Sequence, residues 1–406
     1  MLTRQGRTVL VVSLGLVVAG RLLGVSELWL VGTAGLLLTA AAALWVRGMR
    51  IRIDTVRTVN PRRLHAGASI TVELEVTNRG RGTTPVLQLR DFAGPAGTRS
   101  VGVGATGPTL LNVPPLRAGE AVRTSYSVRC GQRGIAAIGP LEVVLSDPFG
   151  LVALTVQRSV GAELTVWPAL QLIGAPTLSR WSDDGQRPAG APASFSGSDL
   201  VGLRPYRAGD DLRHVHWRAS ARYDDLMVRQ LESPPDDLTT VILDTRASTH
   251  THASFEQALA ATTSILVACA RRDAHVRLLI TSNPANTDLF DSGAGSGERF
   301  TQSLLDELAV VQPNPTASLP ATLAGLQTAV GRGMPGATGH TTVLVGGDTH
   351  DLIPLLTALG GSSSEMLAVA FTSGPHERIE IDPRLLVIDG ETSFEEAWSR
   401  AIGRRA

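Results

Sequence analysis

The sequence predicts a multi-domain chain with an N-terminal transmembrane helical hairpin, a β-sandwich in the middle and an α/β domain at the C-terminus. Three observations support this prediction. Residues 1–50 are rich in apolar residues, and residues 51–170 alternate apolar and polar positions with a period of two. Residues 236–406 alternate short apolar strands with longer helical segments. A chain of 406 residues also favours two or more cores over one.

Two apolar segments, 8–25 and 28–46, predict the hairpin. The second has 19 residues and no charge, which is about the length that crosses a bilayer core. The first contains Arg21, but its eleven Val and Leu residues contribute about 0.3–0.6 kcal/mol each and outweigh the roughly 2.5–3.5 kcal/mol cost of one Arg. A cleaved signal peptide beginning at Arg4 and Arg7 is the alternative. The second span directly behind the first favours the hairpin.

The charges around the hairpin predict its orientation. Basic residues lie on both outer sides, whereas the turn holds only one Arg and one Glu; the outer residues are Arg4, Arg7, Arg47, Arg50 and Arg52. Since loops rich in Arg and Lys stay on the cytoplasmic side, we expect a multi-pass protein of the cell membrane with cytoplasmic soluble domains.

Residues 51–170 are expected to form a small sandwich that resembles an immunoglobulin-like module. Segment 69–78, SITVELEVTN, alternates apolar and polar residues as a half-buried strand does, and Asn78-Arg79-Gly80 then predicts a turn. Further strands are predicted at 121–130, 141–147 and 151–160. We expect this domain to act as a spacer. Residues 171–196, rich in Pro, Ala, Gly and Ser, predict a linker.

Composition excludes several classes of function. Basic and acidic residues number 37 each, a balance that argues against a nucleic-acid-binding protein. The chain contains no Lys, so it cannot form the phosphate loop of a nucleotide hydrolase or use Lys as a catalytic group. Only two cysteines are present, Cys130 and Cys269, and we expect them in different domains and in a reducing compartment.

The last part of the chain predicts an open, mostly parallel sheet covered by helices. The predicted strands are 239–244, 275–282, 340–347, 366–373 and 384–390, and the predicted helices are 254–273, 298–311, 318–330, 351–360 and 393–403. In helix 254–273 one face should carry Phe255, Leu259, Thr262, Leu266 and Cys269. Ligands of such sheets bind at the carboxyl ends of strands, where Asp244 and Asp348 lie.

Residues 197–235 combine six Arg and six acidic residues with aromatic residues. Because Arg pairs with carboxylates and stacks on rings, this segment is either an ion-paired scaffold or a docking surface for a partner. The residues concerned are Arg204, Tyr206, Asp210, Asp211, Arg213, Trp217, Arg218, Arg222 and Arg229. His214 and His216 could share one face of a strand, but no third ligand at a usual spacing supports zinc.

This segment and its lead-in resemble the domain of unknown function 58 family, a group of bacterial membrane-anchored proteins with a von Willebrand factor A-like domain. The resemblance lies in Gly202-Leu203-Arg204-Pro205-Tyr206, Gly209-Asp210-Asp211, Trp217-Arg218, Arg133-Gly134, Gly139-Pro140 and Asp147-Pro148-Phe149-Gly150-Leu151. Position 216 is His where many members have Asp. The resemblance implies a Rossmann-like C-terminal domain of the von Willebrand A type and partnership with a MoxR-type AAA+ ATPase.

The same resemblance implies a metal-ion-dependent adhesion site built from Asp-x-Ser-x-Ser, a Thr and an Asp on three loops. Asp244 and Ser248 match, Thr316 and Asp348 fit the other loops, and Arg246 replaces the middle Ser. A guanidinium about 4 Å from a divalent ion would be repelled by about 8 kcal/mol at an effective dielectric of about 20. We therefore expect a degenerate site in which Arg246 pairs with Asp244 or Asp348. Magnesium, if bound, would use Asp244, Ser248, Thr316 and Asp348.

These features together predict a non-enzymatic membrane adaptor. The family resemblance implies that its partner is an AAA+ ATPase or the client of one, in envelope biogenesis or stress response. The alternative is an extracellular adhesion module with the sandwich as its stalk, which requires the opposite topology. A metal hydrolase built on Asp244, Asp348 and the His pairs is the third hypothesis, and it lacks a recognisable nucleophile and base.

Overall fold

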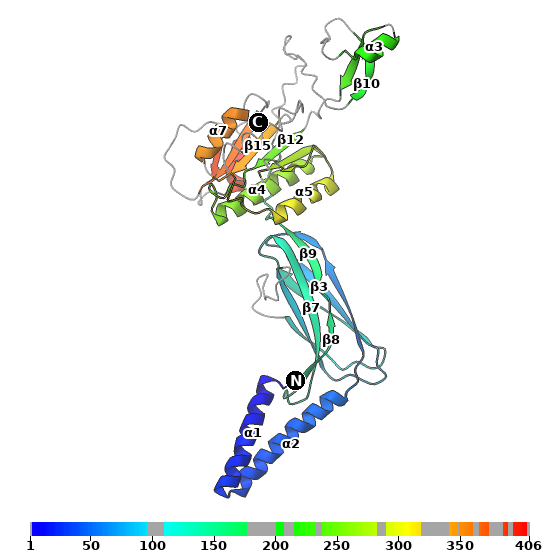
Figure 1. The fold of residues 1–406 in the computed structure, drawn as a ribbon, viewed down its shortest axis with the longest axis vertical. Helices are drawn as coiled ribbons and strands as arrows, with labels where there is room; N and C mark the ends of the chain where they lie inside the picture. The colour runs from blue at the N-terminus through cyan, green and yellow to red at the C-terminus, as the bar shows by residue number, and fades with distance from the viewer. Residues whose placement is uncertain are drawn as a thin grey trace. The chain divides into compact units, whose positions relative to one another are not determined.

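The computed structural model describes residues 2–95, 109–176, 200–206, 215–223, 225–231, 238–281, 290–317, 341–347, 349–359, 365–372, 385–388 and 393–403 (Figure 1). The chain divides into two compact units, Met1–Trp167 and Pro168–Ala406. Cys130 lies in the first unit and Cys269 in the second, and both are buried.

Two antiparallel helices, α1 (Arg4–Leu23) and α2 (Ser26–Gly48), form the predicted N-terminal hairpin (Figure 1). Helix α1 begins four residues earlier than the predicted segment because the Thr3 side chain caps it and accepts a hydrogen bond from the Gly6 N–H at 3.0 Å. Gly24, with φ of 70°, ends the helix in the left-handed conformation. The helices approach closely at Gly20, where a Cβ would lie 2.5 Å from the Trp29 backbone nitrogen.

Three helices of the described residues are long and apolar enough to cross a membrane: α1, α2 and α4 (His252–Ala270). Helix α4 is largely buried inside the second unit, whereas α1 and α2 expose most of their apolar surface. Among the described helices, the hairpin is therefore suited to anchor the chain in a membrane.

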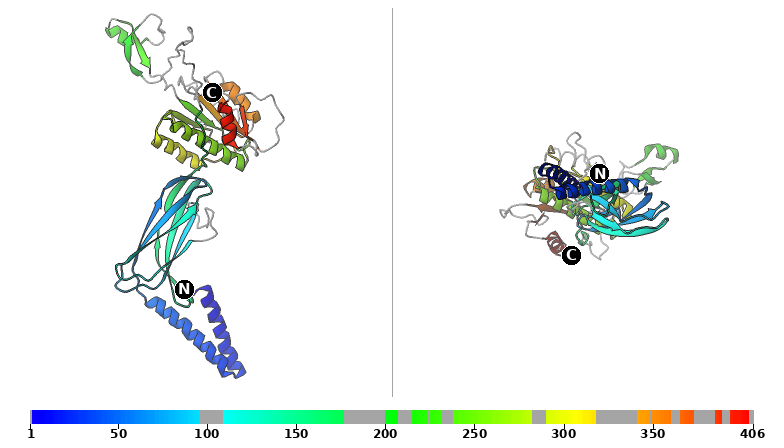
Figure 2. Two further views of the ribbon diagram at one scale, coloured as in Figure 1. Left: turned by 180° about the vertical axis from the view of Figure 1, so that it is seen from behind. Right: turned by 90° about the horizontal axis from the view of Figure 1, so that it is seen from below.

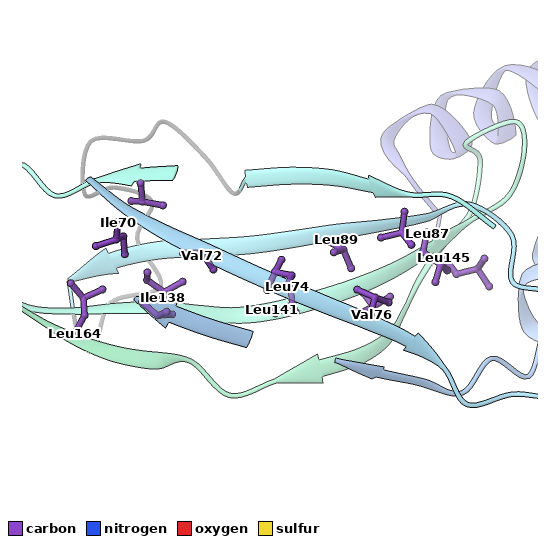
Figure 3. Packing of buried hydrophobic residues seen from close by; sticks show 14 of the residues in the cluster. Ile70, Val72, Leu74, Val76, Leu87, Leu89, Ile138, Leu141, Leu145 and Leu164 are labelled. Carbon is purple, nitrogen blue, oxygen red and sulfur yellow. The ribbon is translucent and has the colours of Figure 1, made fainter. Parts of the chain in front are cut away.

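Two sheets enclose the core of the rest of the first unit. Their strands are β1 (Ile53–Asn60), β3 (Ser69–Asn78) and β6 (Ala121–Arg129) in one sheet, and β2 (Arg63–His65), β4 (Leu87–Pro95), β5 (Thr109–Val113), β7 (Gly134–Ser146), β8 (Ala153–Ser159) and β9 (Ala162–Trp167) in the other. The apolar positions of β3 face the second sheet, as their alternation predicts, and pack on Leu89 and Leu141 (Figure 3). The finer immunoglobulin-like assignment stays a prediction.

The predicted strand 141–147 is too short. The observed strand β7 starts at Gly134 and contains Gly139-Pro140 in its interior. The proline is tolerated there because the strand changes neighbours at this point. Residues 134–138 pair with β9, and residues 141–146 pair with β8. A residue without an N–H does least harm where one ladder ends and another begins.

A buried polar cluster links the two sheets. Arg57 on β1 forms an ion pair with Asp91 on β4 at 2.7 Å, and the Tyr126 hydroxyl on β6 donates to the same carboxylate at 2.7 Å. Arg57 also donates to the carbonyl of Ile138 at 2.9 Å. Burial raises the pKa of Asp91, while Arg57 and Tyr126 act in the opposite direction. Sequence reasoning did not identify this cluster.

The second unit contains a six-stranded sheet of order β14-β13-β12-β15-β16-β17. All pairs are parallel except β13–β14, so the predicted mostly parallel sheet is present. The strands are β12 (Thr239–Leu243), β13 (Val276–Ile280), β14 (Phe290–Asp291), β15 (Thr341–Gly346), β16 (Glu365–Phe371) and β17 (Leu385–Ile388). Parallel strands with buried residues on both faces need helices on both sides.

Helices α4, α5 (Glu298–Val310), α7 (Thr349–Leu359) and α8 (Phe394–Gly403) accompany this sheet (Figure 2). Leu352 and Leu356 of α7 pack on Ile242 and Leu344 of the strands. The single apolar face predicted for α4 is too narrow, because Ala258, Ala261 and Ile265 are buried as well. Helix α4 packs against both the sheet and α5, which explains its burial on several sides. The predicted helix 318–330 lies outside the described residues.

Two described residues of the predicted linker contact the second unit. The Gln171 N–H donates to the Ser264 hydroxyl at 2.9 Å, and the Trp398 indole donates to the Gly174 carbonyl at 2.8 Å. Most of residues 171–196 lie outside the described part of the chain. The segment that follows forms an antiparallel pair, β10 (Leu200–Pro205) and β11 (Met227–Leu231), with α3 (Trp217–Tyr223) between them in sequence.

Candidate functional site

The site predicted at the strand ends lies where the order of the strands reverses. Strand β12 pairs with β13 on one side and with β15 on the other. The chain therefore runs from β12 toward one edge of the sheet and later continues with β15 on the other side of β12. In open parallel sheets, ligands bind outside the carboxyl ends of strands at such a point. Asp244 directly follows β12, and Gly347 directly follows β15.

Three segments meet at this edge. In the loop after β12, the Thr245 carbonyl accepts from the Asn314 N–H at 2.6 Å, and the Ala247 N–H donates to the Asn314 carbonyl at 2.9 Å. Gly347 contacts the same loop, because a Cβ at this position would lie only 1.9 Å from the Thr249 carbonyl oxygen. The position therefore admits only glycine without a backbone shift.

Arg246 points back onto Asp244 and forms a buried ion pair with it. Arg246 Nη2 lies 2.6 Å from Asp244 Oδ2, and Nε lies 3.0 Å from both carboxylate oxygens. The Arg246 backbone N–H donates to Oδ1 at 3.1 Å. The two side chains are only 2% and 1% exposed. Arg246 therefore pairs with Asp244, one of the two carboxylates that the sequence offered to it; the other, Asp348, lies outside the described residues.

This ion pair affects which ions can bind at the carboxyl ends of the strands. Magnesium binds carboxylate oxygen at about 2.0–2.1 Å in near-octahedral geometry. Both oxygens of Asp244 already accept from the guanidinium, so a divalent cation there would lie against a fixed positive charge. Within the described ranges, no group of three or more His, Cys, Asp or Glu side chains is placed to hold a metal ion. Among the residues that the structure describes at this edge, the Asp244 carboxylate does not suit magnesium.

The other predicted site residues are only partly brought together. Ser248 is exposed in the loop after β12. Thr316 is also exposed, and its hydroxyl and backbone N–H both lie 3.1 Å from Asn314 Oδ1, which ties it indirectly to the loop. Asp348 lies outside the described residues. The structure thus joins Asp244 to Arg246 and places Thr316 in a segment that pairs with the Arg246 loop.

Sequence reasoning missed Thr281 and Asn314. Thr281 follows β13, the neighbouring parallel strand, and its hydroxyl accepts from the Thr245 N–H at 2.7 Å. Its place at a carboxyl strand end was the signal that could have identified it. Asn314 lay in a Pro-rich segment without a readable pattern.

His250 completes the edge as an uncharged ring. Its Nε2 lies 2.8 Å from the Asp244 carbonyl oxygen, and the ring meets Phe255 edge-on. Burial lowers the pKa of His250, with Asp244 acting in the opposite direction. The imidazole is therefore neutral at pH 7, and Nε2–H donates to the carbonyl.

Helix α3 carries the described part of the predicted docking segment. Its start is fastened to β11, since the His216 N–H donates to the Met227 carbonyl at 2.7 Å and the Met227 N–H donates to the Ser220 hydroxyl at 2.8 Å. Ala219 of the helix is buried, as are Val215 just before it and Val228 on β11. The outward face, named here the α3 surface, consists of Trp217, Arg218, Ala221 and Arg222.

The remaining predicted residues of this segment are less fully placed. Asp210, Asp211 and Arg213 lie outside the described residues. Arg204 and Arg229 are located by their backbone on β10 and β11, and Tyr206 donates its N–H to the Leu226 carbonyl at 2.7 Å. Trp217 is 65% exposed although it is a large apolar residue.

Comparison with known proteins supports part of the resemblance seen in the sequence. The profile of a family described as "Protein of unknown function DUF58" matches residues 202–382. The "Uncharacterized protein YeaD" of Bacillus subtilis (strain 168) is 23% identical over 210 residues, which cover 52% of this chain and 51% of that protein. The chain therefore matches about half the length of this relative.

Solved structures share only limited similarity with the chain. A CARDB domain of the PF1109 protein from Pyrococcus furiosus is 14% identical, with a TM-score of 0.22, over 29% of this chain and 93% of that one. The alkylpurine DNA glycosylase AlkC of Pseudomonas fluorescens is 12% identical, with a TM-score of 0.21, over 30% and 33% of the two chains. Similarities this low assign neither fold nor function.

Proposed function

We propose that this chain is a membrane-anchored, non-enzymatic adaptor that binds another protein through the α3 surface. The hairpin crosses the bilayer twice, and both soluble units lie in the cytoplasm. The second unit is a von Willebrand factor A-like domain whose strand-end site has lost its metal.

The observation that carries the binding role is the exposed Trp217 on α3. Trp and Arg are the residues most enriched at the energetic centres of protein interfaces. Here Trp217 is 65% exposed, and Arg218 and Arg222 are exposed on the same helix. The helix itself is held by hydrogen bonds to β11, so the three side chains stand on an ordered support. A partner with an apolar pocket rimmed by carboxylates fits this surface.

The buried pair of Asp244 and Arg246 supports the non-enzymatic part of the proposal. A catalytic carboxylate must reach a substrate or a metal ion, but this one is 1% exposed and bonded to a guanidinium. The neutral His250 beside it donates to a backbone carbonyl. These groups hold the loops together, and no nucleophile–base pair is formed by them.

The partner class comes from the resemblance to the domain of unknown function 58 family. A MoxR-type AAA+ ATPase, or its client, is the partner that this resemblance implies, in envelope biogenesis or stress response. The chain itself contains no Lys for a phosphate loop, so a separate ATPase would supply nucleotide hydrolysis.

Crosslinking in native membranes tests this proposal. Wild-type chain, Trp217→Ala and the double variant Arg218→Glu/Arg222→Glu would be crosslinked with and without ATP and purified, and the bound proteins identified. Loss of a central Trp or of paired Arg residues costs about 2 kcal/mol or more, so recovery of the partner should fall more than about tenfold.

Two exposed positions elsewhere in the same unit supply matched controls. Val310→Ala, on α5, and Arg272→Glu, after α4, change similar exposed side chains away from α3 and should leave recovery unchanged. Equal recovery with Trp217→Ala would show that the α3 surface is not the binding site. Absence of an AAA+ ATPase from the wild-type sample would reject the partner class.

A further inference from the structure

A tight turn follows β7 in the segment Asp147-Pro148-Phe149-Gly150-Leu151. The Asp147 carboxylate accepts from the Phe149 N–H at 2.8 Å and from the Val152 N–H at 2.5 Å. Gly150 has a φ of 69°, a conformation that favours glycine. The Asp and Gly of this motif therefore fix the shape of the turn, but they do not explain Phe149.

The turn is bonded to the first residues of the membrane hairpin. The Thr3 N–H donates to the Leu151 carbonyl at 2.9 Å, and the Thr3 hydroxyl donates to the Gly150 carbonyl at 2.6 Å. Gly6 lies so close that a Cβ there would be 2.0 Å from the Leu151 oxygen. Because Thr3 is also the N-cap of α1, the turn lies at the level where this helix begins.

The level of the turn in a bilayer follows from helix geometry. Thr3 is five residues before Thr8, where the apolar segment starts, which corresponds to about 7.5 Å along a helix. The headgroup layer on each side of a bilayer is roughly 5–8 Å thick, from the difference between total and hydrocarbon thickness. If the apolar segment of α1 fills the hydrocarbon core, the turn lies within or at the outer edge of the headgroups.

The side chains on the turn and at the start of α1 are suited to contact a lipid surface. Phe149 is 62% exposed and Leu2, whose backbone bridges to Val152, is 38% exposed. Arg4 and Arg7, on the first turn of α1, are exposed as well. Phe and Leu side chains of membrane-surface elements are buried at the boundary between headgroups and acyl chains, and Arg is attracted by anionic lipids.

We propose that the turn after β7 is a lipid-docking element in which Phe149, together with the exposed Leu2 that bridges to Val152, inserts into the headgroup layer of the membrane that holds the hairpin. This inference rests on the proposed membrane-spanning hairpin and goes beyond the adaptor role. Contact of Phe149 with lipid gives the first unit a second attachment besides α1 and α2, and so restricts how its sheets tilt against the bilayer.

Spin-label accessibility tests the proposal on the full chain. Phe149→Cys would carry a nitroxide label in nanodiscs that contain phosphatidylcholine and phosphatidylglycerol. Cys130 and Cys269 are each 1% exposed, and burial raises the pKa of the Cys130 thiol, so labelling favours the introduced cysteine. Power saturation with oxygen and with a water-soluble nickel chelate then reports whether the label lies in lipid or in water.

Two further variants provide the reference values. Val160→Cys replaces an apolar residue that is 91% exposed, and it lies at the far end of β8, about 20 Å from the turn at the usual rise of a strand. Leu37→Cys replaces a residue of α2 that is 71% exposed and faces lipid in a spanning hairpin. All three positions are exposed, so substitution should not disturb the core.

The expected ratio of oxygen to nickel accessibility is several-fold higher at position 149 than at 160, and highest at 37. A label at 149 with the same ratio as 160, while 37 reports lipid, would overturn lipid docking alone. Exclusion of both agents from position 149 would show that protein covers Phe149, which also overturns it. A water-exposed label at 37 would reject the spanning hairpin on which the inference rests. The crosslinking result through Trp217 judges the adaptor role separately.

Discussion

Arg246 determines the structure of the strand-end site, because its buried, positively charged side chain forms an ion pair with a buried carboxylate. Both charges are desolvated, and the several contacts between them and the backbone compensate for this cost. Removal of Arg246 leaves the Asp244 carboxylate buried without this cation. The stability of the loop and the predicted degeneracy of the metal site therefore depend on the same side chain.

Arg246→Ser, which restores the Asp-x-Ser-x-Ser pattern, should destabilise the second unit by about 3–5 kcal/mol because Asp244 is left buried and unpaired. Thermal unfolding would measure this loss. The double variant Asp244→Asn/Arg246→Ser removes both charges and should be more stable than the single variant. Calorimetric titration with magnesium and manganese should show binding, if at all, only by Arg246→Ser. Tight binding by the unmutated protein would contradict the degenerate site.

At the residue scale, part of the candidate site was predictable. Asp244 and Arg246 follow a buried strand, and local spacing placed their side chains within reach of each other. Asn314 and Gly347 join the site through contacts between segments far apart in the sequence. Such contacts leave no local pattern, so only the assembled sheet identifies them.

At the element scale, two ion pairs of the first unit differ mainly in burial. Arg57 and Asp91 connect the two sheets with side chains that are 7% and 0% exposed. Arg79 and Asp54 form a pair at 3.4 Å with side chains that are 67% and 50% exposed. Because water screens the second pair, only the first should contribute appreciably to the association of the sheets.

Arg57→Leu should therefore lower the free energy of unfolding by about 3–5 kcal/mol, since Asp91 and the Ile138 carbonyl lose their buried donor. The matched change Arg79→Leu should cost about 0–1 kcal/mol. Chemical denaturation followed by tryptophan fluorescence compares the two variants. Equal losses would show that the cluster does not hold the sheets together.

The hairpin offers a similar comparison between two glycines of α1. Gly20→Val should separate the helices, because a Cβ at Gly20 meets the Trp29 backbone at 2.5 Å, whereas Gly15 has open space around it. Titration of the detergent-solubilised chain with SDS should therefore dissociate the Gly20→Val hairpin at a lower concentration than the wild type or Gly15→Val. The same midpoint for both variants would exclude close packing at Gly20.

Elements were predictable where one period dominates the sequence. The alternation in β3 and the long apolar runs of α1 and α2 are local features, and the structure contains these elements. Strand β7 was predicted too short because Gly139-Pro140 resembles a turn, and only its change of neighbours allows the strand to continue. Strands β10 and β11 were not predicted, because the high density of charged residues around them leaves no clear strand pattern in the sequence.

At the scale of the whole molecule, the adaptor proposal depends on which side of the membrane holds the second unit. A reporter fused after residue 406 should fluoresce as a cytoplasmic protein and show no alkaline phosphatase activity, because the basic residues flank the outer ends of the hairpin. Phosphatase activity would instead favour the extracellular adhesion module with the sheets of the first unit as a stalk.

Neighbouring residues in the chain suffice to predict the apolar hairpin, the alternation of the sheet-rich first unit and the parallel sheet of the second. Three contacts appear only in the folded chain: Arg246 pairs with Asp244, Arg57 joins two sheets, and the turn at Phe149 is bonded to the start of α1. Each of these contacts depends on burial and on the path of the backbone, and neither is encoded by a short local pattern.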